Sequence, residues 1–295
     1  MKKVFLLLFI SLTCFSQAKI SYKKSDGLLD ITPYISYMAD SSEKLTFEQV
    51  RNLPASAFTP NTKVGLNLGN TEFPYWFRID FEKNKFNEDL YVFIESPEIR
   101  ILDAYSVDEN GNINKLFTGS RRPFTSRYLT ALNYIIKVPP KYTTLYYKIS
   151  TKSMFLPTYL GTVKTVFKYS HLLDGLYYAL IGLMFALFFY NLFLFFSLKD
   201  KVFLYYSVFV LFSLLNMAKA EGMFHELLWF DEPFLILNEN NNFSTYLVCF
   251  SIYFFTTTFL NTKLITPTLH KVLKAFFIYF VILLIFEFLP YRGWI

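Results

Sequence analysis

The sequence is poor in the residues that crosslink small domains or bind metals. Its 295 residues include two cysteines, Cys14 and Cys249, and three widely separated histidines. We therefore expect neither a disulfide framework nor a structural zinc site. Glycine and proline are scarce too, at 10 and 12 residues, which argues against a disordered or collagen-like chain.

Charge is also sparse, at 18% of residues, and it is unevenly distributed. Residues 19–168 contain 20 basic and 15 acidic side chains, whereas residues 169–295 contain 7 and 8. Apolar residues make up 53% of the chain, with 36 phenylalanines and 22 tyrosines. A water-exposed domain followed by membrane helices explains this split.

The first 18 residues have the pattern of a secretory signal peptide. Lys2 and Lys3 precede a short apolar run over residues 4–12, and Ser16 and Ala18 supply small residues for cleavage. The run is too short for a stable membrane-spanning helix. We therefore expect residues 19–168 to be exported.

Residues 19–168 carry closely spaced strand signals. Tyr75, Phe77, Ile79 and Phe81 alternate with polar or amphipathic neighbours over residues 75–82, which is the period of a strand. Residues 90–95 are apolar on both faces, as in a central strand. Further strands are expected at 28–37, 99–107, 115–118, 132–138, 144–150 and 158–163, with an Asn-Gly hairpin turn at 110–111 and a short helix after Thr46. The pattern predicts an all-β jelly-roll sandwich.

The chain changes character after Lys168. Four apolar runs follow, at about 175–197, 202–218, 243–260 and 272–289, each long enough to cross a bilayer. They lack the polar face that a water-soluble bundle needs. We expect an α-helical transmembrane domain over residues 169–295.

Loop charges predict the orientation of these helices. Lys199, Lys201, Lys263, Lys271 and Lys274 fall in the two loops expected inside. The loop between the second and third helices is mainly acidic. The positive-inside rule therefore places the N-terminal domain outside, in the periplasm of a multi-pass inner-membrane protein.

Short motifs in both halves resemble one family. They are Phe58-Thr59-Pro60, Asn67-Leu68-Gly69, Tyr75-Trp76-Phe77-Arg78, Asp108-Glu109-Asn110-Gly111, Thr118-Gly119, Pro123-Phe124, Arg127, Gly175-Leu176-Tyr177-Tyr178, Tyr190-Asn191-Leu192, Ser197-Leu198-Lys199-Asp200-Lys201 and Leu204-Tyr205-Tyr206. Over residues 27–290 the chain resembles bacterial seven-transmembrane receptors with diverse intracellular signalling modules (7TMR-DISM). Their exported half is similar to carbohydrate-binding modules.

The resemblance implies a receptor that senses an external ligand, such as a carbohydrate, and passes a signal to its membrane helices. Such receptors have seven helices and a cytoplasmic output module, whereas four helices are predicted here, so we expect a truncated form or a fragment. The alternative is a membrane-anchored carbohydrate-binding module without signalling. Expected partners are a small-molecule or glycan ligand, membrane lipid and, as an open alternative, a second copy of the chain.

Two groups of residues are candidates for ligand binding. Trp76 and Arg78 share one face of their strand, where a ring could stack on a sugar and a guanidinium could bind hydroxyls or carboxylates. The alternative is that Trp76 packs on a neighbouring loop and that Arg78 forms an ion pair with an acidic residue. Arg121, Arg122 and Arg127 form a basic cluster that could hold an anion, or could be solvated or salt-bridged.

Other functional classes find little support in the sequence. It contains no phosphate-binding glycine loop, nucleophile elbow, metalloprotease motif or kinase signature. We therefore expect no enzyme activity, no cofactor and no metal site. Nucleic acid is not an expected partner, because the basic residues are scattered and exported. His225 in the external loop could respond to pH, but we expect an ordinary exposed histidine.

Overall fold

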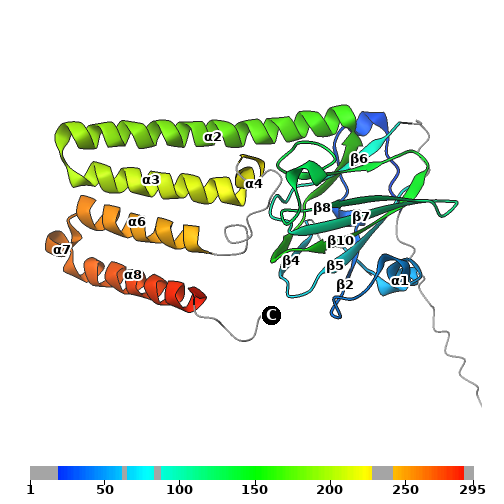
Figure 1. Ribbon diagram of the computed structural model, residues 1–295, viewed down its shortest axis with the longest axis horizontal. Helices are drawn as coiled ribbons and strands as arrows, with labels where there is room; N and C mark the ends of the chain where they lie inside the picture. Colours follow the sequence, from blue (N-terminus) through cyan, green and yellow to red (C-terminus); the bar gives the residue numbers. More distant parts are fainter. Residues whose placement is uncertain (1–18, 62–64, 83–87, 228–241, 289–295) are drawn as a thin grey trace, which may run out of the picture.

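The computed structural model describes residues 19–61, 65–82, 88–227 and 242–288. The predicted signal peptide lies outside the described residues. A β-sandwich occupies one end of the molecule, and a row of long helices extends from it (Figure 1). The predicted fold class is confirmed: an antiparallel β-sandwich is followed by helices that are long and apolar enough to cross a membrane.

The described strands form three antiparallel sheets. One has six strands in the order β3-β2-β5-β10-β7-β8, one has four in the order β1-β12-β6-β9, and β11 pairs with β4. The strands are β1 Leu29–Asp30, β2 Ser36–Ala39, β3 Thr59–Pro60, β4 Asn67–Asn70, β5 Tyr75–Asp80, β6 Leu90–Ile94, β7 Ile101–Asp108, β8 Ile113–Thr118, β9 Tyr134–Val138, β10 Tyr142–Ser150, β11 Ser153–Phe155 and β12 Thr158–Thr162.

Strand β5 shows the predicted alternation of two faces. Phe77 and Ile79 are fully buried in the main core between the two larger sheets. Trp76 points to the opposite face and belongs to a second apolar cluster. The period of two therefore identified the faces of this strand correctly.

Strand β6 is apolar on both faces because both faces are covered. Val92 and Ile94 belong to the main core, and each is fully buried. Tyr91 and Phe93 face the other way, into a cluster that includes Val166 of the first long helix. A strand covered on two sides cannot carry the polar face of an ordinary sandwich strand.

Short helices complete the sandwich. The predicted capping box at the start of α1 (Phe47–Arg51) is present, with Thr46 accepting from the Gln49 amide and Gln49 accepting from the Thr46 amide. Four short 3₁₀ helices are η1 Lys24–Asp26, η2 Thr32–Tyr34, η3 Ala55–Ala57 and η4 Phe124–Ser126. Helix α1 covers the outer face of the six-stranded sheet.

Each of the four predicted apolar runs overlaps a helix in the described part of the chain. The helices after the sandwich are α2 Val163–Leu198, α3 Lys201–Ala220, α4 Met223–Leu227, α6 Phe243–Phe259, α7 Thr262–Ile265 and α8 Pro267–Phe288. Among the described residues, α2, α3 and α8 are long and apolar enough to span a membrane, and α6 is a shorter apolar helix. Helices α2, α3, α6 and α8 pack in chain order (Figure 1).

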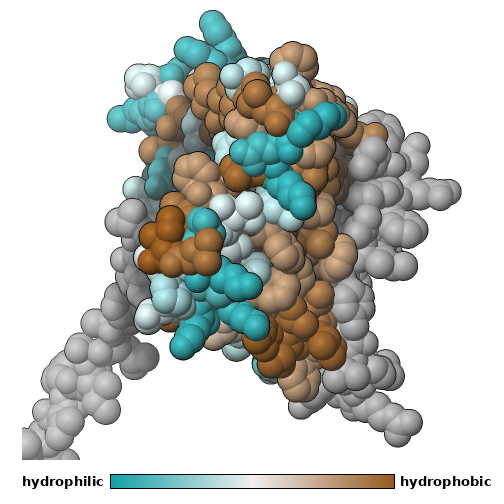
Figure 2. Space-filling view, turned by 90° about the vertical axis from the view of Figure 1, so that its left-hand side faces the viewer, coloured by the Kyte–Doolittle hydropathy of each residue, from teal (hydrophilic) through white to brown (hydrophobic). Residues whose placement is uncertain are grey.

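Aromatic side chains fill the contacts between these helices and also cover their outer surface. The ring centroids of Tyr206 on α3 and Phe255 on α6 lie 5.1 Å apart. The ring of Tyr253 on α6 stacks on that of Phe277 on α8, with their centroids 4.6 Å apart. Figure 2 views the molecule from the end where α2 turns into α3, and hydrophobic residues cover much of the flank. Exposed rings such as Phe189 and Phe193 suit a lipid environment.

Helix α2 is longer than a membrane requires. Its 36 residues span about 54 Å at 1.5 Å per residue, against a hydrocarbon core of about 30 Å. It begins at Val163, directly after β12, and Thr162 caps it by accepting from the Thr165 amide. The domain boundary expected after Lys168 therefore falls inside a continuous helix.

Gly161 allows the close approach of β12 and α2, so its replacement tests this junction. A Cβ at Gly161 would lie 2.4 Å from Thr165 Oγ1, which is itself bonded to the Thr162 carbonyl. We expect Gly161→Ala to destabilise the protein by about 1–3 kcal/mol. Gly175→Ala is the matched control, because nothing lies within 4 Å of its added Cβ. Thermal unfolding of the detergent-solubilised chain checks this, and equal melting temperatures for the two variants would contradict it.

Candidate functional site: the contact between sandwich and membrane helices

The first turns of α2 are fixed against the four-stranded sheet. Val166 is fully buried among Tyr91, Phe93 and their neighbours. The ring of Tyr169 meets Phe93 edge-on at 5.6 Å, and its hydroxyl donates to Glu95 at 3.0 Å. The helix therefore enters the membrane region in a direction that the sandwich sets.

Helix α4 makes a second and separate contact with the sandwich. Gly222 has a φ of +72° and turns the chain between α3 and α4. Met223 then packs on Leu132 of the sandwich, and the hydroxyl of Tyr178 on α2 donates to Glu226. This turn places the side chain of His225 against the sandwich loop that contains Arg122, Phe124 and Arg127.

His225 is enclosed by a loop of the sandwich, and we call its contact with Arg122, Phe124 and Arg127 the His225 contact. Its side chain is only 2% exposed. Nε2 lies 2.9 Å from the Arg122 carbonyl oxygen, and Nδ1 lies 3.2 Å from Nη2 of Arg127. A guanidinium can only donate, so Nδ1 accepts and Nε2 carries the proton. The ring meets Phe124 edge-on at 5.3 Å.

Arg127 is held by carbonyl groups and aromatic rings. Its guanidinium donates to the Ala131 and Leu132 carbonyl oxygens and lies 4.4 Å from the Phe124 ring centroid. On its other side it lies 4.5 Å from the ring of Tyr134. The residue is 8% exposed, and no carboxylate pairs with it among the described residues. The neutral His225 ring supplies one of its acceptors.

These surroundings make His225 resistant to protonation. Burial, together with the neighbouring positive charge of Arg127, lowers the pKa of His225 to about 4. A proton on Nδ1 would replace an acceptor with a second cation. The docked state of α4 therefore requires a neutral histidine.

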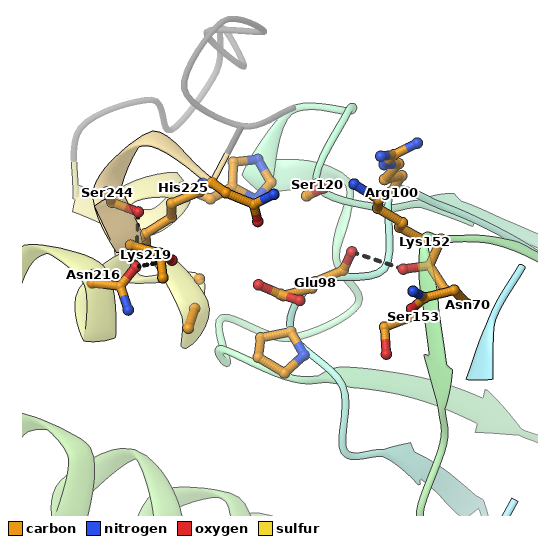
Figure 3. Close-up of a pocket in the computed structure, with 16 residues that line it drawn as sticks. Asn70, Glu98, Arg100, Ser120, Lys152, Ser153, Asn216, Lys219, His225 and Ser244 are labelled. Atoms are coloured by element: carbon orange, nitrogen blue, oxygen red, sulfur yellow. Dashed lines mark hydrogen bonds between the residues drawn. The ribbon is translucent and has the colours of Figure 1, made fainter. Parts of the chain in front are cut away.

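A polar cleft of 410 Å³ lies beside the His225 contact, between the sandwich and the helices. Figure 3 shows Glu98, Arg100 and Lys152 of the sandwich facing Asn216 and Lys219 of α3 across it. Asn216 accepts hydrogen bonds from Ser244 at 2.8 Å and from Thr245 at 3.3 Å, which joins α3 to the start of α6. Relative movement of the two domains would change the shape of this cleft.

The open platform expected around Trp76 is not observed. Trp76 is 1% exposed and lies in a cluster with Phe47 and Val50 of α1. Trp76 is therefore packed, as the alternative to a ligand role supposed, because α1 covers this face of the sheet. Lys148 Nζ lies 5.6 Å from the ring and is bonded to Asp40 at 2.8 Å, which closes the site further.

The predicted arginines do not converge on one ligand site. Arg78 donates through Nε to Asp80 at 3.0 Å, and Arg122 binds Asp103 and the Thr118 carbonyl. Arg121 is exposed on the same loop as Arg122 and Arg127. None of the five predicted residues is among the described residues that line the cleft.

His225 is the functional candidate whose surroundings sequence reasoning did not foresee. It was expected to be exposed, and it is buried in the sandwich instead. Its partners lie about 100 residues earlier in the chain, so no local pattern reveals the contact. The only sequence signal was a histidine beside the glycine turn at Gly222.

Comparison with known families agrees with this two-part arrangement. Residues 32–162 match the family described as 7TMR-DISM extracellular 2, and residues 171–295 match 7TM diverse intracellular signalling. The chain belongs to the 7TMR-DISM receptors. It is a membrane protein with an N-terminal extracellular domain followed by a 7TM-type region. No curated protein matches the chain significantly.

The burial of Trp76 gives a test of its role. Trp76→Ala removes a large ring from the cluster beneath α1, so we expect a loss of about 3–5 kcal/mol in stability. Phe73→Ala is the control, because Phe73 is 38% exposed and should change stability by less than about 0.5 kcal/mol. Denaturant unfolding monitored by tyrosine and tryptophan emission measures both. A Trp76→Ala variant as stable as the control would show that the ring does not support α1.

The His225 contact should weaken in acid. When α4 is docked on the sandwich, the pKa of His225 is about 4, below the usual value of about 6.5. Between these two pH values, each unit of decrease in pH therefore favours the state in which α4 is released by about 1.4 kcal/mol. The contact is at full strength above about pH 6.5 and is lost as the pH falls toward 4. Deuterium uptake of residues 119–132, corrected for intrinsic exchange, should rise between about pH 7.5 and about pH 5.

His225→Gln is the matched variant for this experiment. Glutamine keeps one donor and one acceptor but does not titrate in this range. We expect the acid-dependent rise in uptake to disappear in this variant. An equal rise in both proteins would assign the effect to other groups.

Proposed function

We propose that this chain is the ligand-sensing part of a membrane receptor. In this proposal the sandwich binds an external ligand, and the resulting change reaches the membrane helices by two routes. One route is the direct continuation of β12 into α2. The other is the His225 contact, which connects a sandwich loop to α4 and thereby to the end of α3.

The His225 contact is the observation that carries this proposal. A binding module that is only anchored to a membrane needs no more than a covalent tether, and α2 already provides one. Here a second, buried contact ties residues 122–132 to the outer end of α3. A shift of that loop relative to β12 would change the position of α3 relative to α2, which is the usual form of a signal between packed helices.

The charge distribution supports an orientation for the receptor. Lys199, Asp200 and Lys201 lie at the turn between α2 and α3, at the far end of α2 from the sandwich (Figure 1). Lys263 and Lys271 lie on the α7 and α8 side of the same end. With the sandwich outside, these basic residues face the cytoplasm, as the positive-inside rule requires. We therefore assign the protein to the inner membrane, as a multi-pass protein with a periplasmic sandwich.

Transmission can be tested with spin labels at the cytoplasmic end. In a Cys249→Ser background, labels on Lys199→Cys and Lys263→Cys report the spacing of α2 and α7. His225→Ala breaks the second route, so we expect the mean distance to change by about 1–2 Å or its distribution to broaden, as helix shifts of this size carry signals in other receptors. Pulsed electron paramagnetic resonance measures it.

His171→Ala is the control for this measurement, because His171 is an exposed histidine on α2 outside the His225 contact. It should leave the distance unchanged. If His225→Ala also leaves it unchanged while residues 119–132 become exposed, the helices do not respond to the sandwich. That result would favour the alternative function, a membrane-anchored carbohydrate-binding module without signalling.

A further inference from the structure

Strand β8 lies at the open edge of the six-stranded sheet. It pairs with β7 on one side, and no other described strand lies against its other side. The edge of a sheet presents amide and carbonyl groups that can pair with another extended chain. We call this side of β8 the β8 edge.

The strand register identifies which backbone groups of the β8 edge are open. The hairpin closes with the Asp108 amide donating to the Asn112 carbonyl at 3.1 Å. Bonded pairs alternate along antiparallel strands, so residues 114, 116 and 118 exchange their hydrogen bonds with β7. Lys115 and Phe117 therefore direct their amide and carbonyl groups away from β7. No described backbone group outside the sheet pairs with them.

The side chains of these two residues lie on the outer face of the sheet. Lys115 is opposite Tyr105, and Phe117 is opposite Asp103. The Phe117 ring is 45% exposed and meets the Tyr105 ring edge-on at 5.7 Å. No carboxylate of the described residues forms an ion pair with Lys115. The β8 edge thus combines open backbone groups with an exposed ring and a lysine without a counter-ion.

The inner side of the β8 edge is apolar. Leu116 points the other way from Lys115 and packs against the main core. Beside it, a cavity of 370 Å³ opens toward β9 and is also lined by Ala104 and Ile136. A strand added to β8 would place one row of side chains over this cavity and the other row beside Lys115 and Phe117.

A second copy of the chain in the same membrane does not fit the β8 edge. Strands β7 and β8 run roughly along the direction of α2 (Figure 1). Antiparallel pairing of β8 with the β8 of another copy requires a two-fold axis perpendicular to the sheet, and therefore perpendicular to α2. The membrane helices of the second copy would then point in the opposite direction. The occupant must therefore be another polypeptide.

We propose that the β8 edge binds an extended segment of a partner polypeptide as an additional antiparallel strand. The main-chain groups of Lys115 and Phe117 pair with the segment, which is the bonding of strand addition. Apolar residues of the segment cover the cavity beside Leu116, and an acidic residue lies opposite Lys115. The proposal concerns binding of a partner and does not depend on transmission through the His225 contact.

The probe is a fluorescein-labelled peptide, Val-Tyr-Val-Glu-Val-Thr. Antiparallel pairing places its glutamate opposite Lys115, its tyrosine opposite Phe117 and its central valine opposite Leu116. Fluorescence anisotropy with the full chain in zwitterionic detergent measures binding, and we expect it to saturate. Bound peptide should also slow deuterium uptake of residues 113–118.

N-methylated peptides test the bonding pattern without altering the protein. The amides of the tyrosine and the glutamate face β8, so methylating both should weaken binding by at least about tenfold. The amides of the second and third valines face away from β8. Methylating these two is the matched control and should keep the affinity within about threefold. Equal effects of the two methylated peptides would overturn the proposal.

A charge exchange tests the role of Lys115. Lys115→Glu should weaken binding of the peptide by at least about threefold, because like charges then lie directly opposite each other. A peptide with lysine in place of glutamate should show the reverse preference. Lys164→Glu alters an exposed lysine on α2 and should leave both affinities unchanged. Melting temperatures establish that the variants are folded.

Two further outcomes would overturn the proposal. If the peptide does not bind, Lys115 serves to keep this edge free of partners. If the chain forms a dimer that Lys115→Glu dissociates, the β8 edge belongs to a second copy. Analytical ultracentrifugation of both proteins measures this.

Discussion

A buried guanidinium has to find an acceptor for its donors, and this requirement on Arg127 joins the two halves of the molecule. No described carboxylate pairs with it, so backbone carbonyls, two aromatic rings and one imidazole nitrogen replace a counter-ion. The imidazole is His225, which belongs to the membrane half. If α4 leaves, the sandwich retains a buried charge with one acceptor fewer, which raises the free energy of the separated state.

The apolar outer face of β6 also joins the two halves of the molecule, because the first turns of α2 cover it. Composition suggested a change of character after Lys168, shortly before the long uncharged run over residues 175–197. Packing is continuous across this position, because Val166, Tyr169 and Leu173 of α2 cover Tyr91 and Phe93. The start of the first membrane helix thus covers the outer face of the sandwich. The two families matched by the chain meet in this same region, between residues 162 and 171.

Local patterns in the sequence predicted local structure well. The alternation in β5, the capping box at Thr46 and the apolar runs of the membrane helices each depend on neighbouring residues, and each is present in the fold. The interpretation of Trp76 failed because period two identifies the face of a strand but not what covers it. The cover is α1, which comes from a segment about 30 residues earlier.

The candidate site could not be predicted for a related reason. Arg127 was noticed as one of three clustered arginines, yet their environments differ. Arg121 is exposed, Arg122 pairs with Asp103, and the Arg127 guanidinium contacts His225. The proximity of the three arginines in the sequence therefore does not bring their side chains together at one ligand site. The pairing of Arg127 with a histidine 98 residues away depends on the packing of two domains, which no short motif encodes.

The uninterrupted length of α2 makes it a mechanical lever. Its first turns pack against the four-stranded sheet, and its far end leads into the turn to α3. Over about 54 Å, a tilt of roughly 5° at the sandwich displaces the far end by roughly 5 Å, the rise of one helical turn. A small rearrangement beneath Phe93 and Val166 would therefore be magnified at the far end of α2. In the proposed receptor, the His225 contact would be a second point of attachment, and its presence would decide whether such a movement tilts α2 alone or α2 and α3 together.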